Sequence, residues 1–193
     1  MIRPLACDDS GAALVEFALI APVLLLLGMG LSELAYEAYM EAVVTGAVQQ
    51  AGRAGTIQGA TAATVDANVL SVIQRSNARA AFVGGYPTRK TYADYGYIAP
   101  EPFTDSNSNG VHDAGECFTD VNANGVWDSD PGTSGMGGAG DTVVYTVQVT
   151  YPRPFPMASW LGWDNLANIS VTTILKNQPY ATQQTTTPAT VCA

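Results

Sequence analysis

The chain contains one apolar segment that is long enough to cross a membrane. From Ala12 to Leu34 the only charged residues are Glu16 and Glu33. About 20 apolar residues span a bilayer as a helix, so we expect a transmembrane helix here rather than the buried core helix of a soluble protein. A cleaved secretory signal is the other alternative. That class has small residues after its apolar run, whereas Gly11 and Ala12 come before this one.

The glutamate near the start of this segment is expensive at its position. An ionisable side chain in hydrocarbon costs several kcal/mol unless it is paired or reaches the interface. Glu16 therefore either meets a positive charge or, as the simpler alternative, snorkels to the cytoplasmic interface. Arg3 precedes the segment and the next basic residue is Arg53, which weakly favours a cytoplasmic N-terminus with the bulk of the chain outside.

Beyond the membrane segment the residue pattern predicts an α+β domain. Apolar residues at helical spacing within residues 61–82, followed by Gly84-Gly85, indicate a second, amphipathic helix. Strict alternation over residues 142–151 predicts a half-buried antiparallel strand, and residues 169–175 predict another. We therefore expect a leader at 1–11, a transmembrane and extended helix at 12–57, and an extracytoplasmic domain at 58–193 with an insert at 101–131.

The acidic residues are concentrated in that insert. The chain has a net charge of −9, and the stretch from Glu101 to Asp141 holds eight acidic residues without a single Lys or Arg. The rest of the chain is nearly neutral, so this local charge requires a local explanation, most simply a bound cation. The absence of a basic patch argues against nucleic acid as a partner.

The insert carries two copies of the pattern Asp-x-Asn-x-Asn-Gly-Val-x-Asp. This is the ligand spacing of a calcium loop of the EF-hand type, in which oxygen donors at alternate positions surround one ion and a glycine at the sixth position permits the sharp turn. The first copy has every position filled. Its expected ligands are the side chains of Asp105, Asn107, Asn109 and Asp113, the carbonyl of Val111, and Glu116 at the twelfth position.

The second copy lacks the closing acid. Its expected ligands are the side chains of Asp120, Asn122, Asn124 and Asp128 and the carbonyl of Val126. Its twelfth residue is Pro131, and we expect Asp130 to substitute, which predicts a weaker or irregular site. The chain is thus expected to bind one or two Ca²⁺ ions in a structural role, with an affinity of about 10⁻⁴ to 10⁻³ M. The alternative is a polar loop without an ion.

The three cysteines suggest one bridge. Cys7 leaves with the expected leader, so that the mature chain keeps Cys117 and Cys192. Outside the cytoplasm these two can form a disulfide that ties the C-terminal tail to the insert, with two free thiols as the alternative.

Both ends of the chain resemble the TadE/TadG-like family of tight-adherence (Tad) pilus assembly systems. The resemblance rests on five stretches: Gly11-Ala12-Ala13-Leu14-Val15-Glu16-Phe17-Ala18-Leu19, Ala21-Pro22-Val23-Leu24-Leu25-Leu26, Glu33-Leu34, the segment from Ala47 to Gly55, and the segment from Ile169 to Tyr180. It implies a pilin-like fold, in which a long N-terminal helix crosses the membrane and continues into the globular domain. The acidic insert is not part of the family pattern.

The resemblance also implies a site of processing and assembly. It places cleavage by a prepilin peptidase after Gly11, which makes Glu16 the fifth mature residue and frees the amine of Ala12. In pilin-like proteins the fifth residue is thought to pair with a subunit's N-terminal amine, which agrees with the need of a buried carboxylate for a cation. The expected partners are other pilin or pseudopilin subunits, bound through the N-terminal helix in the bacterial inner membrane and later in a pilus or at the cell surface.

We therefore expect a pseudopilin or minor pilin with a calcium-stabilised exposed domain. The alternative is a membrane-anchored calcium-binding adhesion or binding protein that never polymerises. An enzyme is the least expected class, because the chain has one histidine and no evident pair of nucleophile and base.

Overall fold

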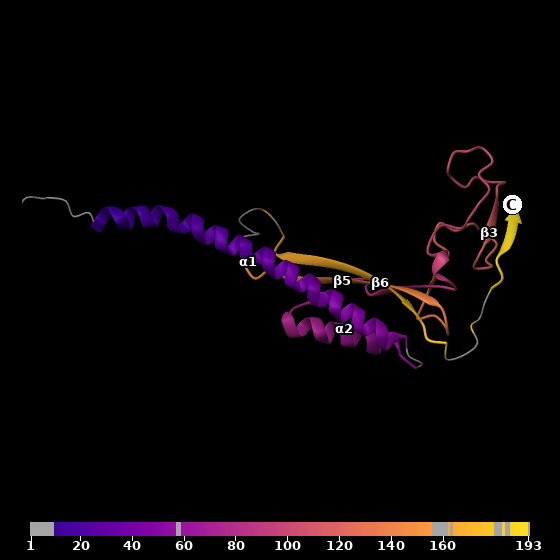
Figure 1. Cartoon of the computed structure of the whole chain (residues 1–193), viewed down its shortest axis with the longest axis horizontal. Coiled ribbons are helices and arrows are strands. Elements are labelled where there is room, and N and C mark those ends of the chain that lie inside the picture. Colours follow the sequence, from indigo (N-terminus) through magenta and orange to yellow (C-terminus); the bar gives the residue numbers. More distant parts are fainter. Residues whose placement is uncertain are drawn as a thin grey trace, which may run out of the picture.

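The computed structural model describes residues 10–56, 59–155, 162, 164–179, 183 and 186–192. Cys7 and all but the last two residues of the expected leader lie outside this range. The chain begins with a helix of 46 residues, α1 (Ser10–Gly55), which is about 70 Å long at 1.5 Å per residue. Its N-terminal half projects away from the rest of the described chain (Figure 1). Within the described residues, α1 is the one helix that is long and apolar enough to cross a membrane.

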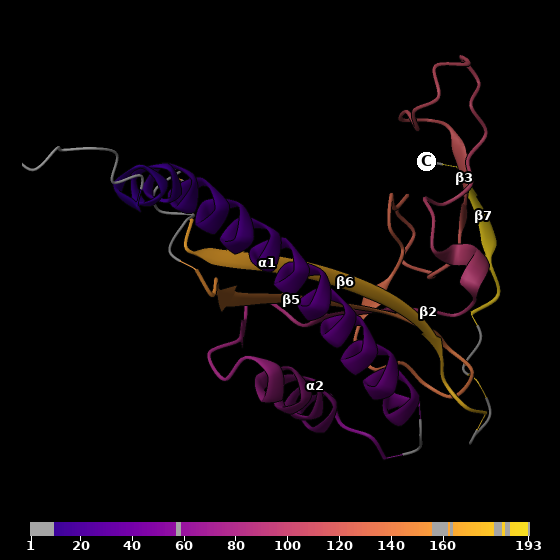
Figure 2. The same ribbon diagram turned by 60° about the vertical axis from the view of Figure 1, so that its left-hand side comes forward.

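The C-terminal half of α1 packs against the globular domain. The second helix, α2 (Ala62–Ser76), lies beside it, and both helices lie on one face of the main sheet (Figure 2). The core they enclose consists of aliphatic residues from the two helices and alternate residues of the long strands. Its fully buried members include Met40, Val44, Val48, Val69, Ile73, Val147 and Val149. The amphipathic pattern of α2 is confirmed, because Val65, Val69 and Ile73 are its buried residues.

Helix α2 is shorter than the sequence pattern predicts. Its start is fixed by Thr61, whose side chain accepts a hydrogen bond from the backbone N–H of Thr64 in a capping box. The helix ends at Ser76, and Asn77 has an extended backbone. The residues up to Phe82, for which the pattern predicts helix, instead include strand β1 (Ala81–Phe82). Ala81 and Phe82 are not helical because their backbone groups pair with the main sheet.

The main sheet is antiparallel and is built around its longest strands. Its members are β1, β2 (Thr88–Tyr92), β4 (Thr133–Ser134), β5 (Thr142–Pro152) and β6 (Leu166–Lys176). Strand β5 pairs with β6 along one edge over eleven residues, and with β1 and β2 along the other. The alternation predicted for β5 is observed, because Val143, Tyr145, Val147, Val149 and Tyr151 are all buried.

Two polar clusters fix the helices to the sheet. Arg89 on β2 donates to both carboxylate oxygens of Asp66 on α2, and the hydroxyl of Tyr145 donates to the same carboxylate at 2.7 Å. Arg153, just after β5, pairs with Glu33 of α1 at 3.0 Å. This ion pair holds the end of β5 beside Glu33, near the end of the apolar segment of α1.

A smaller lobe lies at the end of the molecule opposite to the N-terminus of α1 (Figure 1). It contains the short helix η1 (Tyr95–Tyr97) and a two-stranded antiparallel sheet of β3 (Cys117–Asp120) and β7 (Ala189–Cys192). The fold is therefore α+β, with a long apolar N-terminal helix, a second helix and antiparallel sheets.

Candidate metal-binding loops and membrane helix

The two repeated loops, loop 1 (residues 105–116) and loop 2 (residues 120–131), lie in the small lobe and have closely similar backbones. In loop 1 the fourth and sixth residues, Ser108 and Gly110, have φ of 61° and 76°. In loop 2 the equivalent residues, Ala123 and Gly125, have φ of 62° and 77°. Glycine at the sixth position adopts this left-handed conformation at no steric cost, as the repeat pattern requires.

The first aspartate of each loop accepts hydrogen bonds from the backbone of the turn. The Oδ1 of Asp105 accepts from the N–H of Asn109 at 3.1 Å, and its Oδ2 accepts from Gly110 at 2.8 Å. The two oxygens of Asp120 accept in the same way from Asn124 at 3.3 Å and Gly125 at 2.7 Å. The bond from Gly110 is the main cause that lowers the pKa of Asp105, which favours the ionised carboxylate.

The asparagines and the second aspartate of each loop are also equivalent. In loop 1 the side-chain amides of Asn107 and Asn109 donate to the Oδ2 of Asp113 at 2.8 and 2.7 Å. In loop 2 the equivalent bonds to Asp128 have the same lengths, and their donors are Asn122 and Asn124. The side-chain oxygens expected as calcium ligands are thus gathered within each loop and hydrogen-bonded to amide groups of that loop.

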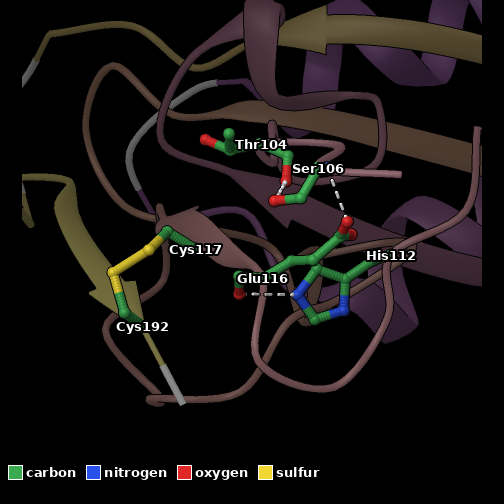
Figure 3. The surroundings of a disulfide bond; sticks show 6 residues. All are labelled: Thr104, Ser106, His112, Glu116, Cys117 and Cys192. Carbon is green, nitrogen blue, oxygen red and sulfur yellow. Dashed lines mark hydrogen bonds between the residues drawn. A yellow bond between two sulfur atoms is a disulfide. The ribbon is translucent and has the colours of Figure 1, made fainter. Parts of the chain in front are cut away.

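Glu116 closes loop 1 with both of its carboxylate oxygens. Oε1 accepts from the backbone N–H of Ser106 at 2.7 Å, and Oε2 accepts from that of Asp113 at 3.1 Å. The first of these bonds is drawn in Figure 3, where the carboxylate points toward Ser106. The second and ninth residues of the loop are thereby joined to the twelfth.

In loop 2 the corresponding bonds are made by a residue that the repeat pattern does not select. The oxygens of Glu101 accept from the backbone N–H groups of Val121 at 2.8 Å and Asp128 at 3.0 Å, which are again the second and ninth residues. The expected substitute, Asp130, is used elsewhere: its carboxylate accepts from Lys90 and from the hydroxyl of Tyr92. In the structure Glu101, and not Asp130, makes the hydrogen bonds that Glu116 makes in loop 1. The expectation that Asp130 is a calcium ligand stays a prediction that these hydrogen bonds do not support.

The environment of Asp130 explains this difference. Burial opposes ionisation of its carboxyl group, but the hydrogen bonds from Lys90, Tyr92 and the N–H of Gly132 outweigh burial and lower its pKa. The pKa of the Tyr92 phenol is raised to about 12, chiefly by burial and secondly by the neighbouring carboxylate of Asp130. Asp130 thus joins the lobe to strand β2 instead of closing loop 2.

The two repeats contact each other through equivalent residues. Phe103 and Phe118 form an antiparallel bridge, and the imidazole of His112 stacks on the indole of Trp127 at 4.9 Å. Trp127 donates from Nε1 to the carbonyl of Glu101 at 2.9 Å, and Nε2 of His112 lies 3.3 Å from the carbonyl of Glu116. The eighth residue of each loop therefore contacts the glutamate that closes the same loop.

Three carboxylates of this lobe are buried without a cationic partner among the described residues. Glu101 is 1% exposed, Asp120 4% and Glu116 6%, and none of them belongs to an ion pair in the described ranges. Burying a carboxylate without a counter-charge is costly. No group of three or more His, Cys, Asp or Glu side chains that could hold a metal ion occurs in the part of the chain that the structure describes.

The lobe is closed by a disulfide. Cys117 on β3 is bonded to Cys192 on β7 at 2.03 Å, directly across the two-stranded sheet (Figure 3). Thr186 adds a hydrogen bond to the carbonyl of Val121 at 3.0 Å. The strand near the end of the chain is thus attached to the segment that links the two loops.

The expected processing and assembly residues lie at the opposite end of the molecule. Gly11, Ala12 and Glu16 belong to the first turns of α1 and are exposed. Large apolar side chains around them are also uncovered, with Leu14 at 70% and Leu19 at 72% exposure.

Residues 11–53 match the family model of the TadE-like proteins. This match confirms the resemblance that the N-terminal residues predict, and it coincides with α1 almost from end to end. No curated protein and no solved structure matches the chain.

The TadE-like segment begins at Gly11, the residue after which cleavage is expected, and ends at Arg53. The domain with the two loops lies outside the match, as does the C-terminal segment from Ile169 to Tyr180, whose similarity to the family stays a prediction. The sequence marks Glu101 as a member of the repeat, although it does not show which loop Glu101 contacts. It precedes Phe103-Thr104-Asp105 as Glu116 precedes Phe118-Thr119-Asp120, so the repeat begins at the glutamate.

Proposed function

We propose that this protein is a structural subunit of a Tad-type pilus or of its assembly complex, a pseudopilin or minor pilin. The observation that carries the proposal is the TadE-like match over residues 11–53, together with the bare apolar surface of the same helix. An apolar surface of this length is stable in a bilayer or against other apolar helices. The subunit therefore inserts through α1 in the inner membrane and later packs through α1 against its neighbours.

Cleavage after Gly11 creates the positive charge with which Glu16 can pair. Cleavage by a prepilin peptidase leaves Ala12 with a free α-amine, whose ordinary pKa of about 8 leaves it largely protonated at neutral pH. The carboxylate of Glu16 pairs with the amine of a neighbouring subunit. Because an unpaired charge within hydrocarbon is costly, this pairing sets the register between adjacent helices.

The small lobe presents a calcium-stabilised surface at the far end of the subunit. The hard oxygen donors of loops 1 and 2 suit Ca²⁺, and a bound cation would lower the cost of burying Glu101, Glu116 and Asp120. The residues that would hold the ions are those expected from the repeat, apart from the acid that closes loop 2. When bound, the ion supplies positive charge and converts two long loops into a rigid unit.

The assembly role is tested by replacing Glu16. Glu16→Ala should leave membrane insertion intact and reduce co-purification with filament proteins, because the helix stays apolar and loses only its charge. Glu41→Ala is the matched control, since Glu41 is an exposed glutamate of the same helix outside the apolar segment. Equal co-purification of both variants with the wild type would rule out the assembly role of Glu16.

The alternative of a membrane-anchored adhesion protein that never polymerises is distinguished by the N-terminus of the mature protein. Mass spectrometry should find a chain that starts at Ala12. A mature chain that retains Met1, in cells that have an active prepilin peptidase, would favour the alternative.

Calcium binding is tested by limited proteolysis of the full chain in detergent. Adding Ca²⁺ should protect residues 101–131 against cleavage, a chelator should remove the protection, and Mg²⁺ serves as the control for ionic strength. The same cleavage pattern with Ca²⁺ and with chelator would refute the proposal.

A further inference from the structure

We propose that Glu101 is the closing ligand of loop 2 and that the two loops bind calcium as a coupled pair. Each loop is then closed by the glutamate with which the other repeat begins. This inference rests on the proposed calcium binding and goes beyond it, because it changes the ligand set, the number of complete sites and their independence.

The first argument is the equivalence of the two glutamates. Each uses its two carboxylate oxygens to accept from the second and the ninth backbone N–H of its loop, at 2.7 and 3.1 Å for Glu116 and at 2.8 and 3.0 Å for Glu101. Each also donates its own N–H to the carbonyl of the ninth residue, at 3.1 and 3.0 Å. Glu101 thus occupies in loop 2 the place that Glu116 occupies in loop 1.

The second argument is electrostatic and does not depend on loop geometry. Glu101 is only 1% exposed and has no ion pair among the described residues, so its negative charge is balanced only by backbone dipoles. Asp130, in contrast, already has Lys90 as a cationic partner, and its side chain is 42% exposed. A cation in loop 2 would relieve the cost of burying Glu101 and would gain little from Asp130.

The third argument is that both sites have the same charge. Loop 1 carries Asp105, Asp113 and Glu116, and loop 2 is contacted by Asp120, Asp128 and Glu101, so the carboxylates of the two loops are equal in number, although no three of them form a metal-binding group in the described residues. Affinity in such loops follows the number of charged ligands and the rigidity of the site. The second site is therefore expected to equal the first in strength, in contrast to the weaker site that Pro131 suggests.

Coupling follows from the contacts between the loops. Glu116 closes loop 1 and continues directly into β3, which leads to Asp120 of loop 2. His112 and Trp127 stack on each other while each contacts the main chain of a closing glutamate. An ion that fixes one glutamate therefore also orders the segment on which the other loop is built, so the second ion has less disorder to remove.

The test is calcium titration of the full chain in detergent micelles by calorimetry. We expect the wild type to bind two ions with positive cooperativity. Glu101→Gln should lower the affinity of loop 2 at least tenfold and should also weaken loop 1. Glu116→Gln should have the mirror-image effect, whereas Asp130→Asn, the matched control, should leave both the number of ions and their affinities unchanged.

Terbium provides a loop-specific readout. Trp127 lies within loop 2 and can sensitise the emission of Tb³⁺ bound there, and Trp127→Phe identifies the part of the signal that comes from it. Glu101→Gln should reduce that part, and Asp130→Asn should not.

The outcomes separate the two proposals. If the wild type binds no calcium, the proposed calcium binding fails. If the wild type binds two ions and Glu101→Gln binds both unchanged, or Asp130→Asn loses one, the role of Glu101 is overturned.

Stability in chelator serves as the folding control. Glutamine keeps only one of the two acceptor oxygens of Glu101, so the Glu101→Gln variant should lose one backbone hydrogen bond and some stability even in chelator. The deciding quantity is the stability that added calcium contributes, which should be smaller in the variant than in the wild type. A variant that is destabilised in chelator and gains as much from calcium as the wild type would show a purely structural role and would also overturn the proposal.

Discussion

Removing the disulfide should release the C-terminal strand and loosen the small lobe. The bridge joins residues 75 positions apart, so it closes a long loop in the unfolded chain. The chain-entropy relation for a loop of this length gives about 4.5 kcal/mol of stabilisation at 25 °C, as an upper value. Strand β7 has little else to hold it, because three of its four residues are exposed.

The hydrogen bonds of the strand do not replace the bridge. A ladder bond contributes about 1 kcal/mol net, whereas ordering a residue of the backbone costs about 1–2 kcal/mol. Strand β7 has four residues and no buried apolar side chain, so the free energy gained from its hydrogen bonds is no larger than the cost of ordering its backbone. Without the bridge the strand therefore gains nothing by staying paired. We therefore expect Cys192→Ser to leave β7 unpaired for much of the time, and to expose the edge of β3 that β7 covers.

Hydrogen exchange read by mass spectrometry measures this directly. Peptides that contain residues 117–120 and 189–192 should lose protection by up to about 10³-fold, since each 1.4 kcal/mol corresponds to a factor of ten. Peptides from β5 and β6 should not change, because the bridge lies outside the main sheet. Thr190→Ser, which leaves the bridge intact on the same strand, is the control. Unchanged protection of residues 117–120 in Cys192→Ser would refute the reasoning.

Three further predictions concern the core, the Arg89–Asp66 ion pair and the ionisation of Tyr92. Ile73→Ala, at a residue with 0% exposure in the core between the helices and the sheet, should cost about 2–5 kcal/mol in denaturant unfolding. Asp66→Asn should cost up to about 3 kcal/mol by the same measurement, because it leaves the guanidinium of Arg89 largely buried beside a neutral group. Tyr92 should titrate near pH 12, seen as the difference in phenolate absorbance between wild type and Tyr92→Phe. Because the folded-state pKa is raised above 10, the contribution of this phenol to stability should be complete below pH 10 and decrease as the pH rises through 12. In Asp130→Asn the phenol should titrate at a lower pH, and an unchanged midpoint would contradict the contribution assigned to the Asp130 carboxylate.

Several features of the fold follow from local pattern. The long apolar run of α1, the helical spacing of α2 and the alternation in β5 predict elements that the structure contains, because each pattern reflects the face that an element buries. The predicted end of α2, at Phe82, is wrong, since the helix stops at Ser76. Ala81 and Phe82 have no local signal against helix, and they are strand because β5 offers partners for their backbone.

The two loops also combine features that local sequence predicts with features that depend on distant contacts. The spacing of Asp, Asn and Gly is sufficient to predict two turns with the same backbone, since the hydrogen bonds that define them join residues within five positions of each other. Local spacing does not determine whether Asp130 or Glu101 contacts the backbone of loop 2. Asp130 belongs to loop 2 in sequence, but Lys90 and Tyr92 draw it to strand β2, and no local pattern contains that information.

The sequence by itself thus determined the TadE-like helix, the α+β class and the two turns, because these depend on interactions between near neighbours or on the match between a helix and a bilayer. The tertiary structure alone decided where β1 begins, which strand holds the C-terminal segment and which carboxylate accepts hydrogen bonds from the second and ninth residues of loop 2. These depend on the pairing of segments that are distant in the chain. In particular, the antiparallel contact of Phe103 with Phe118 brings Glu101 to a loop whose ninth residue lies 27 positions further along.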